Sequence, residues 1–331
     1  MIPHQNLEGQ DNAIRDTNDD ATVSRLSAAQ LGYLVDPFVH LFVRRPVRRS
    51  PIINRGTFIR QRALDSLVEQ FLQSPGPKKQ IVALGAGFDT RYFIIKSGPG
   101  AENLKKYFEV DFPELTVKKA MSIQRHPALH NILGPKEDIR LEKGGTELIG
   151  PDYCLVGGDL REWDQVAARL IHHGLDPTIP TMFLSECVFI YIAPEVSQYI
   201  LEWITREIKQ AMFVLYEQIK PDDAFGRMML KNLQERSIEL KGIHAYPDLS
   251  AQENRFMGLG WQKAKAVDIN ELHDHWLDVT EKSRIARLEI LDELEEWHLL
   301  SSHYCVSWAY KTDEPDTPWS SIDLKKAKKH T

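Results

Sequence analysis

Four segments of this chain carry residue types that could bind a small polar ligand. Gly85-Ala86-Gly87 follows an apolar run, and Asp111, Asp159 and Glu186 stand at or just after the ends of later apolar runs. Glycines at these positions would let a ligand approach the backbone closely, while carboxylates accept hydrogen bonds from hydroxyl and amino groups. A single acid at such a place is often a helix cap. Three in succession after a Gly-x-Gly pattern favour a ligand site.

Short apolar runs that are typical of buried strands precede these residues. Longer amphipathic runs, typical of helices, separate them, and this alternation predicts a parallel sheet covered by helices on both faces. Ligands of such sheets bind beyond the carboxyl ends of the strands, where the candidate residues stand. We therefore predict an α/β, Rossmann-like, doubly wound fold with a mostly parallel sheet of seven strands, near 80–84, 106–111, 152–156, 180–184, 211–215, 264–267 and 304–310.

The order of these runs also predicts how the chain is divided. Residues 1–20 are polar and acidic, which is typical of a disordered arm, and residues 21–310 would form a single domain. Within it, we expect a helical N-terminal extension over 21–78 that closes as a lid, and a core over 79–310 with an insertion at 131–150. Residues 311–331 would form a flexible polar tail.

Composition narrows the class of protein. The chain is 42% hydrophobic and 27% charged with a net charge of −6, an ordinary globular balance that argues against a general nucleic-acid binder. The longest apolar stretch is too short to span a membrane. Three widely spaced cysteines argue for a reducing compartment, so we expect a cytoplasmic location. We expect no metal, because neither His172-His173 nor His273-Asp274-His275 has the spacing of a zinc site.

The glycine motif and the acids point to an adenosine-containing ligand. Asp111 stands near the usual place of a ribose-binding acid. Thr90 replaces the third glycine of a dinucleotide fingerprint, and Asp89 would repel a pyrophosphate, so an NAD-dependent oxidoreductase is disfavoured. S-adenosylmethionine is cationic at sulfur and suits the acids better. Its own carboxylate would need an arginine, and the candidates are Arg25, Arg60, Arg62 and Arg91.

Several longer motifs make the chain resemble a known family. From about Ala21 to Ala309 it is similar to the leucine carboxyl methyltransferase family, whose members share the class I methyltransferase fold. The Leu-Gly-x-Gly-x-Asp-Thr motif is common to a broader group of methyltransferases, whereas the flanking segments are more specific. The motifs are Asn54-Arg-Gly-Thr-Phe-Ile-Arg60, Leu84-Gly-Ala-Gly-Phe-Asp-Thr-Arg91, Tyr107-Phe-Glu-Val-Asp-Phe-Pro113, Gly158-Asp-Leu-Arg161, Ser185-Glu-Cys-Val188 with Tyr191, and Leu291-Asp-Glu-Leu-Glu-Glu296 with His303-Tyr304.

The resemblance implies a role for each candidate residue. Arg60 and Arg25 would pair with the methionine carboxylate of the cofactor, Arg25 standing where the family often has a lysine. Gly85 would approach the methionine portion, and Asp111 would accept the ribose hydroxyls. The remaining implied contacts are Asp159 and Leu160 at the adenine, Glu186 at the amino-acid end, and Tyr191 as a catalytic wall of the active site.

The resemblance also implies an activity. The chain would be a monomeric O-methyltransferase that esterifies the C-terminal leucine α-carboxylate of the protein phosphatase 2A catalytic subunit, regulating holoenzyme assembly and leaving S-adenosylhomocysteine as product. Two other functions remain open. The chain could instead resemble a relative that methylates a carboxyl group on a modified tRNA base, although it has no surplus of basic residues. A catalytically inactive scaffold could bind the phosphatase, although the set of crevice residues is intact.

Overall fold

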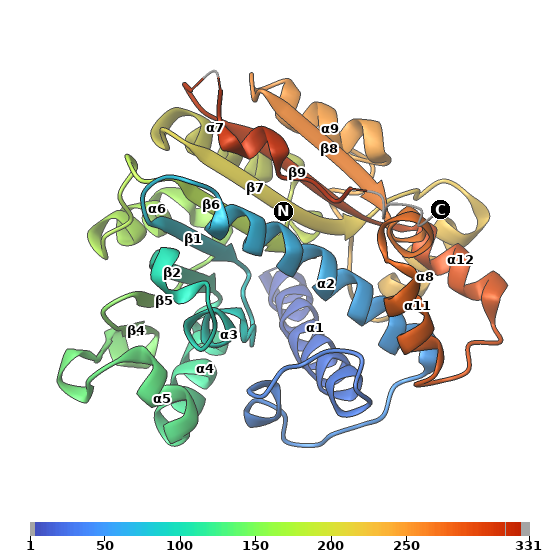
Figure 1. Cartoon of the computed structure of the whole chain (residues 1–331), viewed down its shortest axis with the longest axis horizontal. Coiled ribbons are helices and arrows are strands. Elements are labelled where there is room, and N and C mark those ends of the chain that lie inside the picture. The colour runs from blue at the N-terminus through green and yellow to red at the C-terminus, as the bar shows by residue number, and fades with distance from the viewer. Residues whose placement is uncertain (1–3, 315, 326–331) are drawn as a thin grey trace.

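A computed structural model describes residues 4–314 and 316–325. Within them the centre of the molecule is a nine-stranded sheet of order β3-β4-β5-β2-β1-β6-β7-β9-β8 (Figure 1). The strands are β1 (Lys79–Leu84), β2 (Leu104–Asp111), β3 (Arg140–Glu142), β4 (Glu147–Ile149), β5 (Tyr153–Gly157), β6 (Thr181–Glu186), β7 (Ala211–Gln218), β8 (Lys263–Asp268) and β9 (Tyr304–Lys311).

Helices cover both faces of this sheet. The α-helices are α1 (His4–Gln30), α2 (Pro51–Gln73), α3 (Arg91–Lys96), α4 (Pro113–Arg125), α5 (Pro127–Leu133), α6 (Trp163–His172), α7 (Pro194–Glu207), α8 (Ala224–Glu235), α9 (Leu249–Met257), α10 (Ile269–Glu271), α11 (Val279–Ala286) and α12 (Leu294–Ser302). Short helical turns are η1 (Val39–Leu41), η2 (Ala101–Asn103), η3 (Lys136–Asp138), η4 (Lys143–Gly145), η5 (Leu160–Glu162), η6 (Phe189–Tyr191), η7 (Leu272–Trp276) and η8 (Pro318–Ser321). Among the described residues no helix has both the length and the apolar character to cross a bilayer.

The predicted doubly wound α/β fold is confirmed. All seven expected strands are present, and β5, β2, β1, β6 and β7 run parallel, while β9 lies antiparallel between β7 and β8. Every residue of β1 and β7 is buried, as apolar strands covered on both faces must be. Within the described chain, the number of strands was underestimated, because the insertion at 131–150 forms β3 and β4, which pair antiparallel at the edge beside β5.

Two expected flexible segments are ordered where the structure describes them. The expectation of a disordered arm over 1–20 is wrong for residues 4–20, which belong to α1; residues 1–3 lie outside the described residues. The expectation of a flexible tail is wrong near Trp319, which is buried against Phe71 and Tyr310. Flexibility of both stretches was predicted from their average polar composition. An average does not show that single apolar residues such as Trp319 and Ile322 are buried.

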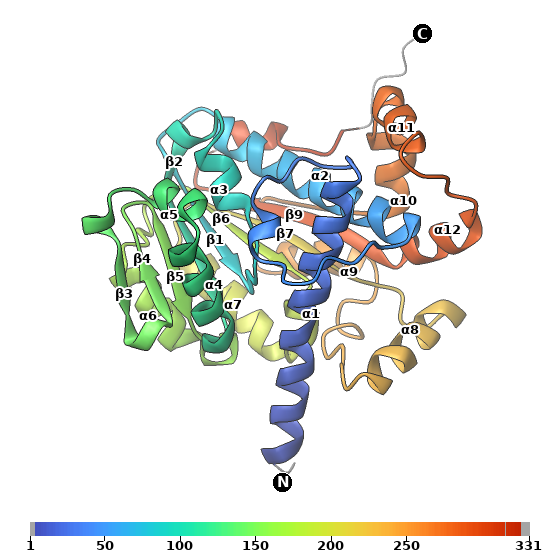
Figure 2. The same cartoon turned by 90° about the horizontal axis from the view of Figure 1, so that it is seen from below.

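The position of α1 matters most for the site. In Figure 2, α1 runs across the molecule near the ends of the central strands, with α8 beside its N-terminal half and α2 beside its other end. Its Ala13 and Ile14 pack on a small apolar cluster that includes Ile190 and Ile238. An N-terminal helix therefore covers the edge of the sheet where ligands of this fold bind.

Candidate functional site

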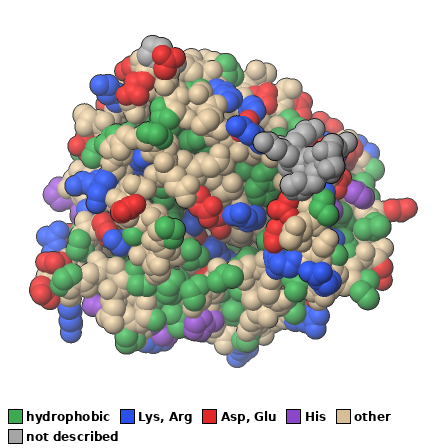
Figure 3. All heavy atoms as spheres, viewed as in Figure 1, with side chains coloured by type: hydrophobic (Ala, Val, Ile, Leu, Met, Phe, Trp, Pro, Cys, Tyr) green, Lys and Arg blue, Asp and Glu red, His purple; other side chains and the backbone are tan. Residues whose placement is uncertain are grey.

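A cavity of about 550 Å³ opens at the carboxyl ends of the parallel strands and is roofed by α1. Parallel register carries the ends of β2, β1 and β6 to this edge, where Asp111 pairs with Gly157 of β5 and Leu84 with Ser185 of β6. On the face shown in Figure 3, acidic and basic side chains gather around a hollow near the centre. The cavity lining includes all eight predicted site residues, namely Arg25, Arg60, Gly85, Asp111, Asp159, Leu160, Glu186 and Tyr191.

The glycine turn after β1 forms a cradle that larger residues would fill. Gly85 and Gly87 have φ angles of +63° and +48°, in the left-handed region that favours glycine. A Cβ atom at Gly85 would lie 2.4 Å from Val188 Cγ2, and one at Gly87 would lie 2.3 Å from Asn18 Oδ1. Both glycines line the cavity, and larger residues here would collide with their neighbours, so the residues present fit an adenosine-type cofactor that approaches the backbone closely.

Asp111 holds this turn from the end of β2. The amides of Gly87 and Phe112 donate to its carboxylate oxygens at 2.6 and 2.7 Å. Burial raises the pKa of Asp111 to about 6, and the two amide donors offset part of that effect. The carboxylate has further lone pairs that can accept ribose hydroxyls. The ribose contact of Asp111 remains a prediction.

We predict that cofactor affinity rises with pH as Asp111 ionises. Below its pKa of about 6 the group is protonated, and binding of ribose hydroxyls must first release that proton. Affinity for S-adenosylhomocysteine should therefore fall about tenfold from about pH 7 to about pH 5. Titration calorimetry at both pH values measures this change. The Asp111→Asn variant should bind weakly with little pH dependence; an equally steep dependence in that variant would assign the proton to another group.

Opposite the acid lies a group of arginines that share carboxylates. Arg60 of α2 contacts Glu186 at 2.8 Å and lies over the ring of Tyr216. Arg91 contacts Glu186, Asp89 and Asp65. Although burial opposes ionisation, Arg91 and Arg60 lower the pKa of Glu186 below its ordinary value. Arg60, whose side chain is 23% exposed against 3% for Arg91, has more surface free for an incoming carboxylate.

Arg25 is held more tightly than its expected role requires. Its guanidinium contacts the buried Asp36 at 2.6 Å and Asp89 at 3.1 Å. Burial opposes ionisation of Asp89, but Arg91 and Arg25 lower its pKa to about 2. Arg25 therefore lines the cavity but is largely neutralised. Arg62, the remaining candidate, is not one of the described residues that line the cavity; it contacts Glu69 at 3.7 Å.

The expected adenine contacts lie after β5. Leu160 is buried and begins η5, and Asp159 caps this turn by accepting from the Arg161 amide. The Arg161 side chain donates to both oxygens of Asp159 and also contacts Asp11 of α1 at 2.7 Å. The sequence did not predict this bridge, which links Asp159 to the N-terminal helix.

Apolar side chains that were not predicted line part of the cavity, which we call the apolar compartment. Tyr191 of η6 also lines the cavity. Burial raises the pKa of its phenol well above the ordinary value, so the phenol stays protonated and can donate a hydrogen bond. The other walls come from α2, α8, α12 and the segments that follow α8 and β8, which are distant from one another in sequence. They include Ile53, Leu233, Ile238, Ile269, Trp297, Leu300 and Tyr304.

Polar contacts hold α1 over this cavity. Asn18 accepts from the Phe88 amide at 2.8 Å, and Asp20 contacts Arg49 and Arg236 at 3.1 and 2.8 Å. Arg236 and Asp20 are more than half exposed, so these ion pairs are weak and are screened by salt. Asn18 and Asp20 precede the segment expected to act as a lid, 21–78, whose closure remains a prediction.

We predict that loosening this contact speeds cofactor release. Asp20→Asn removes two exposed ion pairs, which together contribute about 0.4–2 kcal/mol, so the dissociation rate should rise about two- to thirtyfold. Stopped-flow release of S-adenosylhomocysteine measures it, and Glu207→Gln, which removes an exposed pair with Arg206, is the control. A dissociation rate equal to that of the unmodified protein at low salt would show that the ion pairs of Asp20 do not retain the cofactor.

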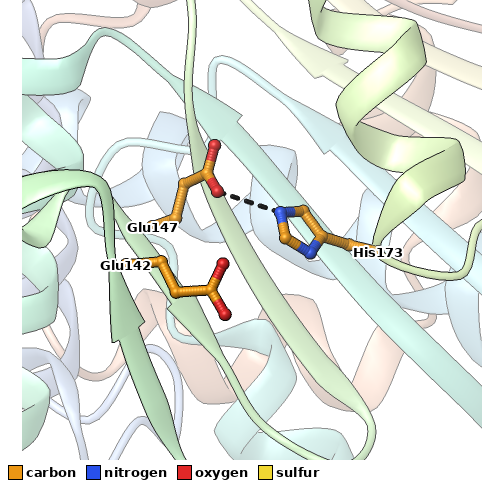
Figure 4. A group of neighbouring side chains, drawn as sticks. All are labelled: Glu142, Glu147 and His173. Atoms are coloured by element: carbon orange, nitrogen blue, oxygen red, sulfur yellow. Dashed lines mark hydrogen bonds and ion pairs between the residues drawn. The ribbon is translucent and has the colours of Figure 1, made fainter.

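A second polar cluster lies at the sheet edge, away from the cavity. Glu142, Glu147 and His173 place ligand-type atoms within 4.8 Å of one another (Figure 4), and His173 Nε2 is 2.9 Å from Glu147 Oε2. Lys143 and Arg169 also contact Glu147, at 3.1 and 3.5 Å. These cations balance the buried carboxylate, which favours an ion-pair cluster that joins β4 to α6 over a metal site. The absence of a metal remains a prediction.

The parallel sheet order, the glycine turn and the acid at the end of β2 define a class I methyltransferase. Residues 4–205 match the sequence profile of the leucine carboxyl methyltransferase family. The chain is 45% identical over 298 residues to the Leucine carboxyl methyltransferase 1 homolog of Arabidopsis thaliana, covering 90% of this chain and 89% of that protein. It therefore belongs to this family, and it is a carboxyl O-methyltransferase that uses S-adenosylmethionine.

Two further comparisons concern a relative with another name and a solved methyltransferase structure. The human tRNA wybutosine-synthesizing protein 4 is 38% identical over 307 residues, which cover 91% of this chain but 44% of that protein. A solved Haemonchus contortus N-methyltransferase with bound S-adenosylhomocysteine aligns with a TM-score of 0.43 at 13% identity, over 76% of this chain and 53% of that chain.

Proposed function

We propose that this enzyme methylates the C-terminal leucine α-carboxylate of the protein phosphatase 2A catalytic subunit. The observation that supports this most is the lining of the cavity, in which the predicted cofactor residues and the apolar compartment belong to one space. A leucine side chain could fill that compartment, beside Trp297, Leu300 and Ile238. The proposal also rests on family membership, since the leucine carboxyl methyltransferase name describes this chemistry.

Cations that line the cavity fit a substrate that ends in a carboxylate. Arg49, Arg236 and Lys241 line the same cavity, and Asp20 partly neutralises the first two. Exposed cations attract an anionic chain end and speed its encounter without binding it tightly. Weak binding is an advantage here, because a carboxylate held by strong ion pairs is stabilised in its ground state and reacts more slowly.

The proposed mechanism needs no general base. A terminal α-carboxyl group has a pKa near 3.5 and is already ionised at neutral pH. When bound, S-adenosylmethionine supplies a methyl group on a sulfonium, so that a carbon–oxygen bond forms as the carbon–sulfur bond breaks. The residues of this chain orient the carboxylate oxygen in line with that methyl group and exclude water.

Tyr191 is the residue we propose to orient the carboxylate. Its phenol stays protonated in this buried site, so it can donate a hydrogen bond to one carboxylate oxygen while the other oxygen attacks. A neutral donor orients the nucleophile with less ground-state stabilisation than a cation would. The role of Tyr191 is thus positioning through contact with substrate rather than proton transfer.

The decisive experiment is methyl transfer from labelled S-adenosylmethionine to the phosphatase 2A catalytic subunit. A copy lacking the last leucine serves as the control, and base treatment of the product tests for an ester. Base-labile label on the intact subunit alone supports the proposal. Label on neither protein, with cofactor binding intact, would contradict the phosphatase as substrate and leave a carboxyl methyltransferase with another acceptor.

The alternative acceptor is a carboxyl group on a modified tRNA base. The similarity to human tRNA wybutosine-synthesizing protein 4 favours this function. The net charge of −6 argues against it, because a negatively charged protein repels polyanionic tRNA. The same assay with total tRNA as acceptor separates the two, because label on tRNA and none on the phosphatase would support the alternative.

A further inference from the structure

Behind the glycine turn lies a buried ion pair that takes no part in lining the described cavity. Lys119 of α4 and Glu109 of β2 meet at 2.5 Å, and both side chains are fully buried. Tyr153 of β5 donates to the same oxygen of Glu109 at 2.6 Å. Glu109 belongs to the Tyr107–Pro113 motif, but neither the fold nor the chemistry described above accounts for an acid at this position.

The pair reaches the cofactor site through the backbone of one residue. Lys119 Nζ donates to the carbonyl oxygen of Asp89 at 2.7 Å. The carboxylate of Asp89 in turn contacts Arg25 and Arg91, and Arg91 also contacts Glu186. One ammonium group thus fixes the peptide from which the shared carboxylate–guanidinium network extends.

Stability alone does not explain such a pair. A fully buried ion pair pays a large desolvation cost, and well-packed apolar residues often stabilise a fold as well or better. Burial raises the pKa of Glu109, and its second oxygen, Oε1, lacks a hydrogen-bond partner among the described residues. Apolar residues could fill the space, but they could not donate to the Asp89 carbonyl. That donation is the function which requires the lysine, and Glu109 pairs with the ammonium group and orients it.

We propose that Lys119, held by Glu109, is a positioning residue that fixes the Asp89 peptide and thereby orders the arginines that receive the amino-acid end of the cofactor. This inference rests on the cofactor orientation proposed above, with ribose at Asp111 and the methionine carboxylate at Arg60. It predicts that loss of Lys119 weakens binding of the amino-acid portion of the cofactor more than binding of the ribose. Asp111, the proposed ribose acceptor, is bonded to the glycine turn at Gly87 and not at Asp89.

The test compares two ligands that differ only in the part this network receives. Because a single replacement would leave one buried charge unpaired and could unfold the protein, the variant is the double substitution Glu109→Gln/Lys119→Met, with folding checked by thermal unfolding. Its dissociation constant for S-adenosylhomocysteine should rise about tenfold or more, because the charge-assisted hydrogen bonds to the amino-acid end of the ligand are no longer held in place. Its dissociation constant for 5′-methylthioadenosine, which lacks the amino-acid portion, should change less than about threefold.

A matched control removes a different buried pair. Glu217 and Arg255 are also buried and lie 3.4 Å apart, and Glu217→Gln/Arg255→Met should leave the preference between the two ligands unchanged. Equal weakening of both ligands in the Lys119 variant, or no weakening in a folded variant, would overturn the positioning role. If the unmodified protein did not prefer S-adenosylhomocysteine, the proposed cofactor orientation would fall together with this role.

Discussion

Replacing Arg60 with alanine should weaken binding of S-adenosylmethionine by about 10- to 150-fold while the fold survives. The size follows from the loss of a charge-assisted hydrogen bond to the methionine carboxylate, about 1.5–3 kcal/mol. The side chain is partly exposed within the cavity, and Glu186 keeps its contact with Arg91 after the change. No buried charge is therefore left without a partner among the described residues. Titration calorimetry measures the affinity, and thermal unfolding checks the fold.

The same helix provides a matched control for this prediction. Arg62 lies two residues further along α2, has a half-exposed side chain and contacts Glu69. Arg62→Ala should therefore leave the dissociation constant within about twofold. If Arg60→Ala also stayed within that range, Arg60 would not bind the methionine carboxylate, and Arg91 would become the cation to test.

Asp111→Ala should cost a similar factor, but at the other end of the cofactor. The change removes the acceptor for the ribose hydroxyls, again worth about 1.5–3 kcal/mol or 10- to 150-fold. It also leaves the Gly87 amide without its carboxylate acceptor, which loosens the turn. Since the buried carboxylate already resists ionisation, its removal relieves part of a desolvation cost, and we expect the protein to remain folded.

Ligand fragments separate the two effects. Arg60→Ala should lower affinity for S-adenosylhomocysteine and spare adenosine, whereas Asp111→Ala should lower affinity for both ligands. Asp164→Ala, which removes an exposed acid of α6 that contacts Tyr199, is the control. Unchanged adenosine affinity in the Asp111 variant would remove this residue from the ribose site.

Together these contacts describe a cofactor site in which most charges are already paired. Arg25, Arg60 and Arg91 share Asp36, Asp65, Asp89 and Glu186 in a network that spans α1, α2, β6 and the glycine turn. Charges fixed by neighbouring groups need little rearrangement when a ligand arrives. A zwitterionic amino-acid group can enter such a network without leaving a large net charge in the cavity.

The sequence by itself determined the strands and the residues at their ends. Apolar runs of strand length, interrupted by amphipathic helices, identify a parallel sheet because burial on both faces demands them. Since parallel strands end at the same edge, Gly85, Asp111, Asp159 and Glu186 could be assigned to one site from their positions alone. The family motifs selected Arg25 and Arg60 among four candidate arginines and added Leu160 and Tyr191, and the structure brings all of these residues to the same cavity.

Only the tertiary structure decided what covers the site and how its charges are divided. Residues 4–20 have no strongly amphipathic pattern, and their helix is held by contacts to distant residues such as Phe88, Arg161 and Arg236. The apolar compartment is likewise built from α2, α8 and α12. Pairings between residues 70 or more positions apart leave no periodic signal in the chain, because they depend on how the packed elements meet.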